Sequence, residues 1–185
     1  MAIRAAYDSL GQVMGENARK IILKAAGLTR VLDAPPEYTF DREFTNQEQA
    51  AVYRETIKLV GAVGSQGILR QMGYKNVETA VVKYHVLDSL KDLPPAERIV
   101  RCFEFSQSVL NKGRVTIDEQ GLPMLDVFDC LTCEGATSDK PFCSQYGGGL
   151  QFMADFSFGK GKYQVIESRC KAMGHESCLF SLVKR

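Results

Sequence analysis

Three cysteines and one glutamate in the last quarter of the sequence are the residues best suited to hold a metal ion. Cys143 lies in the segment F-C-S-Q-Y-G-G-G, while Glu167, Cys170 and Cys178 lie in E-S-R-C-K-A-M-G-H-E-S-C. Three thiolates and one carboxylate supply the four donors of a closed tetrahedral zinc site. A closed site leaves no coordination position for a substrate, so the predicted zinc is structural rather than catalytic.

Two predicted strands, residues 163–167 and 178–183, position these donors. Antiparallel pairing of the strands brings Glu167 close to Cys178, and the loop between the strands lets Cys170 fold back toward the same point. The spacing by itself leaves two interpretations open, a zinc site and a group of separate buried thiols.

A second cysteine pair, Cys130 and Cys133, forms a C-x-x-C motif after a predicted strand that ends at Phe128. Such a pair can ligate a metal, cycle as a redox dithiol, or lie inert in a loop, and the motif does not choose among these roles. If one of the pair displaced Glu167, the site would become all-thiolate. Cys102 stands apart on a predicted amphipathic helix, where core packing is its expected role.

The motif E-x-x-C-x-A-x-G-x-x-x-C from Glu167 to Cys178, with Cys143 and its trailing glycines, resembles the signature of the 4-vinyl reductase domain family. That family includes sensory domains of phenol- and xylene-responsive bacterial transcription activators, proteins linked to bacteriochlorophyll synthesis, and archaeal proteins described as hydrocarbon-binding. Its fold is similar to that of the vesicle-tethering TRAPP subunits. The resemblance covers mainly the last roughly 75 residues.

In the phenol sensors of that family, three cysteines and one glutamate hold zinc. The resemblance therefore implies Zn²⁺ ligation by Cys143, Glu167, Cys170 and Cys178. The sequence departs from the family pattern in its additional C-x-x-C pair and at His175, where an acidic residue is usual. An imidazole at this place could compete for the metal, but a solvated surface group is its expected role.

The order of elements predicts an α+β fold, in which N-terminal helices pack with a small antiparallel sheet and zinc stabilises the C-terminal part. The predicted helices are residues 3–27, 47–63, 96–110 and 143–158, and helical periodicity also starts near residue 68 and resumes over 77–90. The predicted strands are residues 115–119, 124–128, 163–167 and 178–183. Gly61, Gly64 and Gly67 predict a turn or close backbone packing rather than one long helix.

We expect a single domain over residues 1–185. Its helical N-terminal part spans residues 1–92, and its 4-vinyl reductase-like part with the zinc site spans residues 93–185. No internal repeat or low-complexity segment interrupts the sequence.

Amphipathic helices over a small sheet leave room for an apolar cavity, and the family resemblance also implies a ligand pocket. Aromatic side chains and one histidine are the candidates to line it: Tyr84, His85, Phe103, Phe105, Tyr146 and Phe152. The imidazole of His85 could hydrogen-bond a phenol or ligate the metal of a tetrapyrrole.

Composition narrows the class of partner. The 23 Lys and Arg residues nearly balance the 22 Asp and Glu residues, so no overall field attracts nucleic acid. Apolar runs are too short for a membrane span, and the N-terminus lacks the apolar core of a signal peptide. We therefore expect a cytoplasmic protein whose six cysteines are kept as thiols.

These observations predict a carrier or sensor that binds a small hydrophobic ligand, either a tetrapyrrole intermediate or an aromatic hydrocarbon, and that works as a homodimer or with a protein partner. One alternative is an oxidoreductase, either a vinyl reductase of chlorophyll-type pigment synthesis or a thiol redox protein that uses Cys130 and Cys133. The sequence contains no dinucleotide-binding fingerprint to support a reductase. A further alternative is an assembly scaffold.

Overall fold

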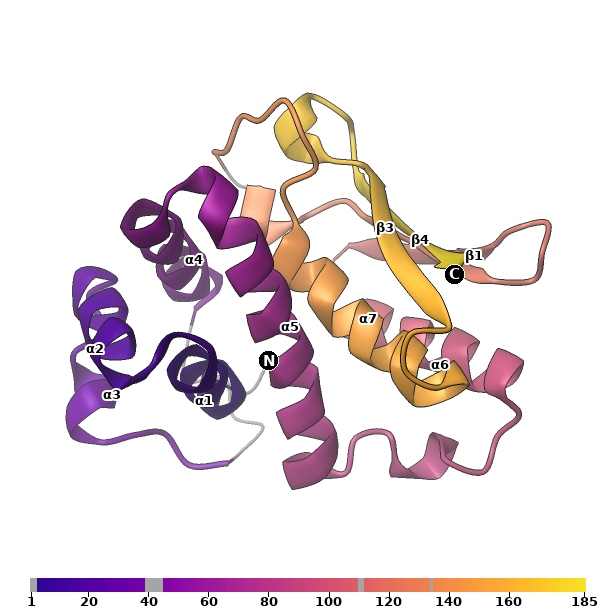
Figure 1. Ribbon diagram of the computed structural model, residues 1–185, viewed down its shortest axis with the longest axis horizontal. Coiled ribbons are helices and arrows are strands. Elements are labelled where there is room, and N and C mark those ends of the chain that lie inside the picture. The colour runs from indigo at the N-terminus through magenta and orange to yellow at the C-terminus, as the bar shows by residue number, and fades with distance from the viewer. Residues whose placement is uncertain (1–2, 39–44, 110–111, 134) are drawn as a thin grey trace.

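The computed structural model describes residues 3–38, 45–109, 112–133 and 135–185. Helices α5 and α7 lie side by side at the centre, with the N-terminal helices on one side and α6 and the sheet on the other (Figure 1). The described helices are α1 (Ile3–Met14), α2 (Glu16–Ala25), α3 (Arg30–Asp33), α4 (Asn46–Val60), α5 (Ala62–Tyr84), α6 (Pro95–Ser108) and α7 (Ser144–Phe158). The strands are β1 (Gly113–Ile117), β2 (Pro123–Val127), β3 (Tyr163–Arg169) and β4 (Cys178–Lys184). The predicted α+β fold with a small antiparallel sheet is confirmed.

Three short 3₁₀ turns complete the described elements: η1 (Asp88–Leu90), η2 (Leu131–Cys133) and η3 (Lys171–Met173). The predicted helix over residues 96–110 corresponds to α6, which starts with Pro95 in its first turn. Its predicted end at Leu110 lies outside the described residues. None of the helices in the described ranges is both long enough and apolar enough to cross a membrane.

The sheet is antiparallel, with the strand order β1-β2-β4-β3. Both predicted strand pairs form. Their register differs from the simplest expectation, because Glu167 pairs with Phe180 and Cys178 pairs with Val127 on the other side of β4. A bulge follows Glu167 in β3. Glu167 and Cys178 therefore approach each other diagonally at the end of the sheet and are not direct cross-strand partners.

Glycines divide the N-terminal helices differently from the prediction. The single helix predicted over residues 3–27 is wrong, because Gly15 adopts φ 83° and separates α1 from α2. Gly61, with φ 79°, ends α4 as expected. The predicted break at Gly64 and Gly67 is wrong, because both glycines lie inside the continuous 23-residue helix α5.

Close packing of α5 against α7 explains why Gly73 of α5 and the glycine run at the start of α7 have no side chains. A Cβ atom at Gly73 would lie 1.8 Å from the carbonyl oxygen of Gln145, and one at Gly148 would lie 1.9 Å from that of Arg70. The two backbones are therefore in direct contact, and any side chain at either glycine would force the helices apart. This contact fixes the N-terminal end of α7 against α5.

The buried side chains form two clusters. One surrounds α1, α2, α4 and the middle of α5 and includes Leu10, Ile22 and Leu69. The other lies between α6, α7 and the sheet and includes Phe103 and Phe180. All six cysteines belong to this second cluster, and every one except Cys102 lies at the end of the sheet, so the candidate site is part of the hydrophobic core.

Candidate metal centre

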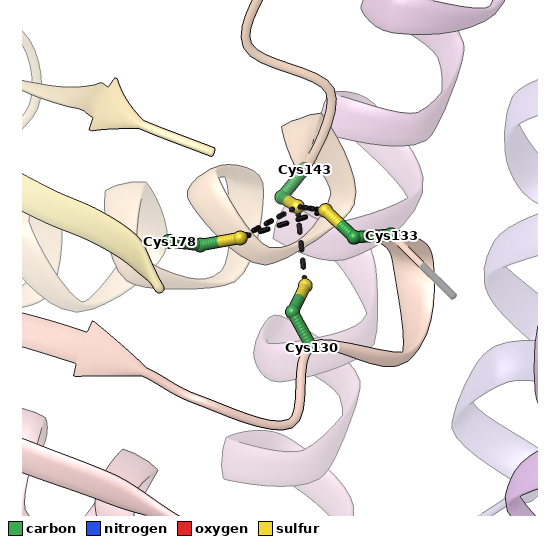
Figure 2. A group of neighbouring side chains, drawn as sticks. All are labelled: Cys130, Cys133, Cys143 and Cys178. Atoms are coloured by element: carbon green, nitrogen blue, oxygen red, sulfur yellow. Dashed lines mark hydrogen bonds between the residues drawn. The ribbon is translucent and has the colours of Figure 1, made fainter. Parts of the chain in front are cut away.

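Five of the six cysteines meet where the sheet ends against the N-terminus of α7. Cys143 directly precedes α7, Cys178 begins β4 and Cys170 lies between β3 and η3. Cys130 directly precedes the η2 turn, and Cys133 is its last residue. Figure 2 shows four of these side chains pointing toward one another, with Cys130 and Cys133 on one loop, Cys143 at the start of α7 and Cys178 at the start of β4. Their exposed fractions are 6 % or less, so all five thiols are buried.

The sulfur atoms lie close enough together to surround one ion. Cys143 Sγ is 3.1 Å from Cys130 Sγ, 2.9 Å from Cys133 Sγ, 3.5 Å from Cys178 Sγ and 3.9 Å from Cys170 Sγ. Cys133 Sγ is also 3.3 Å from Cys170 Sγ and 3.5 Å from Cys178 Sγ. Four sulfurs bound to zinc at about 2.3 Å stand about 3.8 Å apart, so small side-chain adjustments would complete a tetrahedron.

Two overlapping sets of four donors have all their ligand atoms within 4.8 Å of one another. The first is the set implied by the family resemblance: Cys143, Glu167, Cys170 and Cys178. The second is all-cysteine: Cys130, Cys133, Cys143 and Cys178. The structure therefore brings the predicted metal ligands together and adds the C-x-x-C pair, Cys130 and Cys133, as competitors for the same ion.

Glu167 connects the cysteines to the rest of the fold. Its Oε2 atom accepts a hydrogen bond of 2.8 Å from the backbone N–H of Cys143, while its Oε1 atom is buried with no hydrogen-bond partner among the described residues. Burial raises the pKa of Glu167 to about 8, and the neighbouring Cys170 thiol adds to this effect. Hydrogen bonding with Cys143 lowers the pKa of the Cys170 thiol to about 6. A bound dication would favour the ionised form of each donor.

Cys102 and His175, whose side chains could also bind a metal, lie outside this centre. Cys102 packs in α6 with no exposed surface, 4.0 Å from Ser157 Oγ, and burial raises the pKa of its thiol to about 11. His175 is exposed and belongs to neither donor set. Both placements agree with the structural roles expected for these two residues.

A cavity of about 280 Å³ adjoins the metal centre, where β3 faces the N-terminal end of α7. Its apolar walls include Val165, Ile166 and Phe180, and its polar groups include Arg70, Ser144 and Glu167. Cys143 lines it as well, so two residues, Cys143 and Glu167, both line the cavity and belong to a donor set.

Arg70 is held in place because its Nη2 atom donates to Gln151 Oε1 at 3.1 Å and to the carbonyl of Val165 at 3.0 Å. The sequence offers little signal for Arg70, because its role depends on the contact between α5 and α7.

The aromatic residues predicted to bind a ligand are spread through the fold. Phe103 is fully buried in α6, and Phe105 packs at the edge of the same core. Tyr146 packs against Phe180 with ring centroids 5.5 Å apart, and Phe152 meets Tyr74 edge-on at 5.2 Å.

Tyr84 and His85 lie at the far end of α5. The Tyr84 ring contacts Tyr38 at a centroid distance of 5.9 Å. His85 adopts φ 56° at the end of the helix, its side chain is 69 % exposed, and its Nδ1 atom lies 2.9 Å from Asp88 Oδ2. None of the six predicted ligand-binding residues is among those that line the 280 Å³ cavity, and their role in ligand binding stays a prediction.

No family model matches the sequence, and no curated protein matches it. Solved structures do match. The chain superposes over 98 % of its length on 98 % of an H-NOX protein from Shewanella oneidensis in the Fe(II)NO ligation state, with a TM-score of 0.64 and 9 % identity. It superposes over all of its length, 100 %, on 95 % of a point variant of Tt H-NOX, with a TM-score of 0.65 and 12 % identity.

A third match is the phenol-responsive sensory domain of the transcription activator PoxR, solved with phenol. The chain covers 75 % of that domain with 76 % of its own length, at a TM-score of 0.56 and 14 % identity. At such identities the likeness shows a shared fold. The fold is therefore one that small-molecule sensory domains use.

Proposed function

We propose that this protein binds a small molecule in the cavity beside the cysteine cluster and acts as a sensor or carrier, with a structural zinc ion at the cluster. One observation carries the proposal: the cavity of about 280 Å³ is lined by Cys143, which belongs to both donor sets, and by Glu167, which accepts a hydrogen bond from the Cys143 N–H. A ligand in the cavity would thus touch residues that the metal centre holds in place. The fold shared with a phenol-responsive sensory domain supports this proposal.

The ligand class that suits this cavity is a small aromatic molecule with a polar group, such as a phenol. The volume of about 280 Å³ lies just below the range of about 300–1,000 Å³ for ligand sites. Ile166 supplies exposed apolar surface, while Glu167 can accept a hydrogen bond from a hydroxyl group. A tetrapyrrole intermediate is too large for such a volume, so we favour the aromatic hydrocarbon class over it.

Heme does not suit the described residues. One of the matching structures concerns heme redox potential and porphyrin distortion. In this chain the only two histidines, His85 and His175, are exposed, so neither offers a buried imidazole to a heme iron. We therefore propose no heme-dependent activity.

Zinc does suit the donors present. Each of the two donor sets gathers its four ligand atoms within 4.8 Å, all five thiols are buried, and buried thiolates are costly unless a cation compensates them. We further propose membership of the 4-vinyl reductase (hydrocarbon-binding) family, on the strength of the motif from Glu167 to Cys178. A second copy of the chain or another protein would receive the signal.

Titration of the zinc-loaded protein with phenol and other monocyclic aromatics, followed by calorimetry, tests the ligand proposal. Ile166→Trp partly fills the cavity from its half-exposed wall and should weaken binding by at least about tenfold, or about 1.4 kcal/mol. Ile117→Trp is the matched control, because Ile117 is also exposed on a strand but does not line the cavity. Equal weakening by both variants, or no saturable binding by the parent protein, would refute the proposed site.

A further inference from the structure

The two donor sets cannot both hold one tetrahedral ion. Each supplies four ligands, and they have only Cys143 and Cys178 in common. The remaining two ligands are therefore either the C-x-x-C pair, defined above, or Glu167 with Cys170. The family resemblance implies the second pair, whereas the arrangement of the side chains favours the first.

We infer that zinc at this centre is held by four thiolates, those of Cys130, Cys133, Cys143 and Cys178, and that Glu167 lies outside the metal's ligand set (Figure 2). This inference rests on the proposed zinc ion and specifies its coordination. It also gives Glu167 a different role, as a positioning residue that belongs to the ligand cavity.

The η2 turn prepares the C-x-x-C pair for chelation. The backbone N–H of Cys133 donates to the carbonyl of Cys130 at 3.1 Å, which folds the two residues between the cysteines into a tight turn. Both sulfurs then face Cys143, at 3.1 Å and 2.9 Å. Because the pair closes such a short loop, binding through both thiolates costs little additional chain entropy.

The chemistry of the donors favours the same set. All four cysteines are buried, and thiolates are preferred zinc ligands, whereas carboxylates suit harder cations. Glu167 already uses its Oε2 atom to accept the Cys143 N–H at 2.8 Å. Its Oε1 atom has no hydrogen-bond partner among the described residues, and Glu167 lines the cavity. Its carboxylate thus orients Cys143 and can accept a hydrogen bond from a ligand.

The residues that follow β3 complete the surroundings of a four-thiolate ion. Such an ion leaves two excess negative charges, which nearby hydrogen-bond donors stabilise. The backbone N–H of Lys171 donates to Cys178 Sγ at 3.3 Å. Cys170 Sγ lies 3.3 Å from Cys133 Sγ, beside the four proposed ligands.

Two matched double variants separate the donor sets. Cys130→Ser with Cys133→Ser removes the C-x-x-C pair, and Glu167→Gln with Cys170→Ser removes the other, while both keep Cys143 and Cys178. Zinc content and competition with a chromophoric chelator are measured for each. We expect the first variant to lose more than about 100-fold in zinc affinity and the second less than about tenfold, the low end for an outer-shell partner.

X-ray absorption at the zinc edge of the unmodified protein gives a readout that does not depend on how the variants fold. The expected result is one zinc per chain with four sulfur neighbours at about 2.3 Å. A shell of three sulfurs and one oxygen, two zinc ions per chain, or loss of zinc from the Glu167→Gln, Cys170→Ser variant would overturn the four-thiolate assignment alone. Absence of zinc from the unmodified protein, even after exposure to zinc, would overturn the proposed zinc ion as well.

Discussion

The carbonyl oxygen of Gln145 in α7 stands 1.8 Å from the position that a Cβ atom at Gly73 in α5 would take. Gln145 is the second residue of α7, and Cys143 directly precedes that helix. The packing of two backbones thus determines where a proposed metal ligand lies, although neither Gly73 nor Gln145 belongs to the metal centre.

Gly73→Ala should destabilise the protein by about 1–3 kcal/mol or more, because the added methyl group must push apart two helix backbones that have no room to adjust. Gly67→Ala in the same helix is the matched control. Nothing lies within 4 Å of a Cβ atom there, so the substitution should stabilise by about 0.4–1 kcal/mol. Urea unfolding of the two variants measures both values, and a Gly73→Ala protein as stable as its parent would contradict the close contact.

The His85 side chain should contribute nothing to the stability of the folded protein, and its backbone conformation should lower that stability. Its φ of 56° is a left-handed conformation that glycine adopts without strain. His85→Gly should therefore leave stability unchanged or raise it by up to about 1 kcal/mol, after the loss of an exposed contact with Asp88 worth at most about 1 kcal/mol. Thermal unfolding checks this. A large loss of stability, or loss of zinc, would show a role for His85 that its exposure does not suggest.

The sequence predicted what depends on local pattern and missed what depends on contacts between distant segments. Alternating residues revealed the strands, and the motif from Glu167 to Cys178 singled out possible metal donors that the fold brings close together. The break at Gly15 and the continuity through Gly67 were missed, because a glycine's backbone conformation is decided by the tertiary packing around it.

The centre itself shows the same limit. The C-x-x-C pair was recognised as a candidate for metal binding, but its convergence on Cys143 required the fold of the loop after β2. Arg70 was not recognised at all. Its place in the cavity follows from the close approach of α5 to α7, to which Gly73 and Gly148 contribute without any sequence motif.

Removal of zinc should lower the melting temperature by roughly 8–16 °C, if the ion contributes about 4 kcal/mol to a domain of this size. Calorimetry with and without a strong chelator measures the shift. A water-soluble thiol reagent should then react with the four proposed ligands, Cys130, Cys133, Cys143 and Cys178, only after chelation. Cys102 provides the internal control, because burial raises the pKa of its thiol to about 11 and should keep it slow in the folded protein. Fast reaction of the cluster before chelation would argue against a closed zinc site.

Asp126 should make the protein sensitive to acid. Its carboxylate is buried in β2, where Oδ1 accepts hydrogen bonds from Ser177 Oγ at 2.7 Å and Arg169 at 2.8 Å, and Oδ2 accepts one from Arg114 at 3.2 Å. Burial raises the pKa of Asp126, but Ser177 and the two arginines outweigh burial and hold it below its ordinary value. Because the pKa is lower in the folded state, the stabilisation is present above about pH 4 and is lost as the pH falls further.

Asp126→Asn should therefore cost about 1–3 kcal/mol at neutral pH, mainly through the hydrogen bonds to a charged acceptor, since both arginines are exposed enough for water to screen their ion pairs. The difference in unfolding free energy between the parent and the variant should stay constant from pH 7 to about pH 5 and shrink below about pH 4. Zinc release in acid affects both proteins alike and cancels in this difference. Urea unfolding across the pH series measures it, and a difference that persists undiminished at about pH 3 would show that Asp126 does not stabilise the fold as an ionised group.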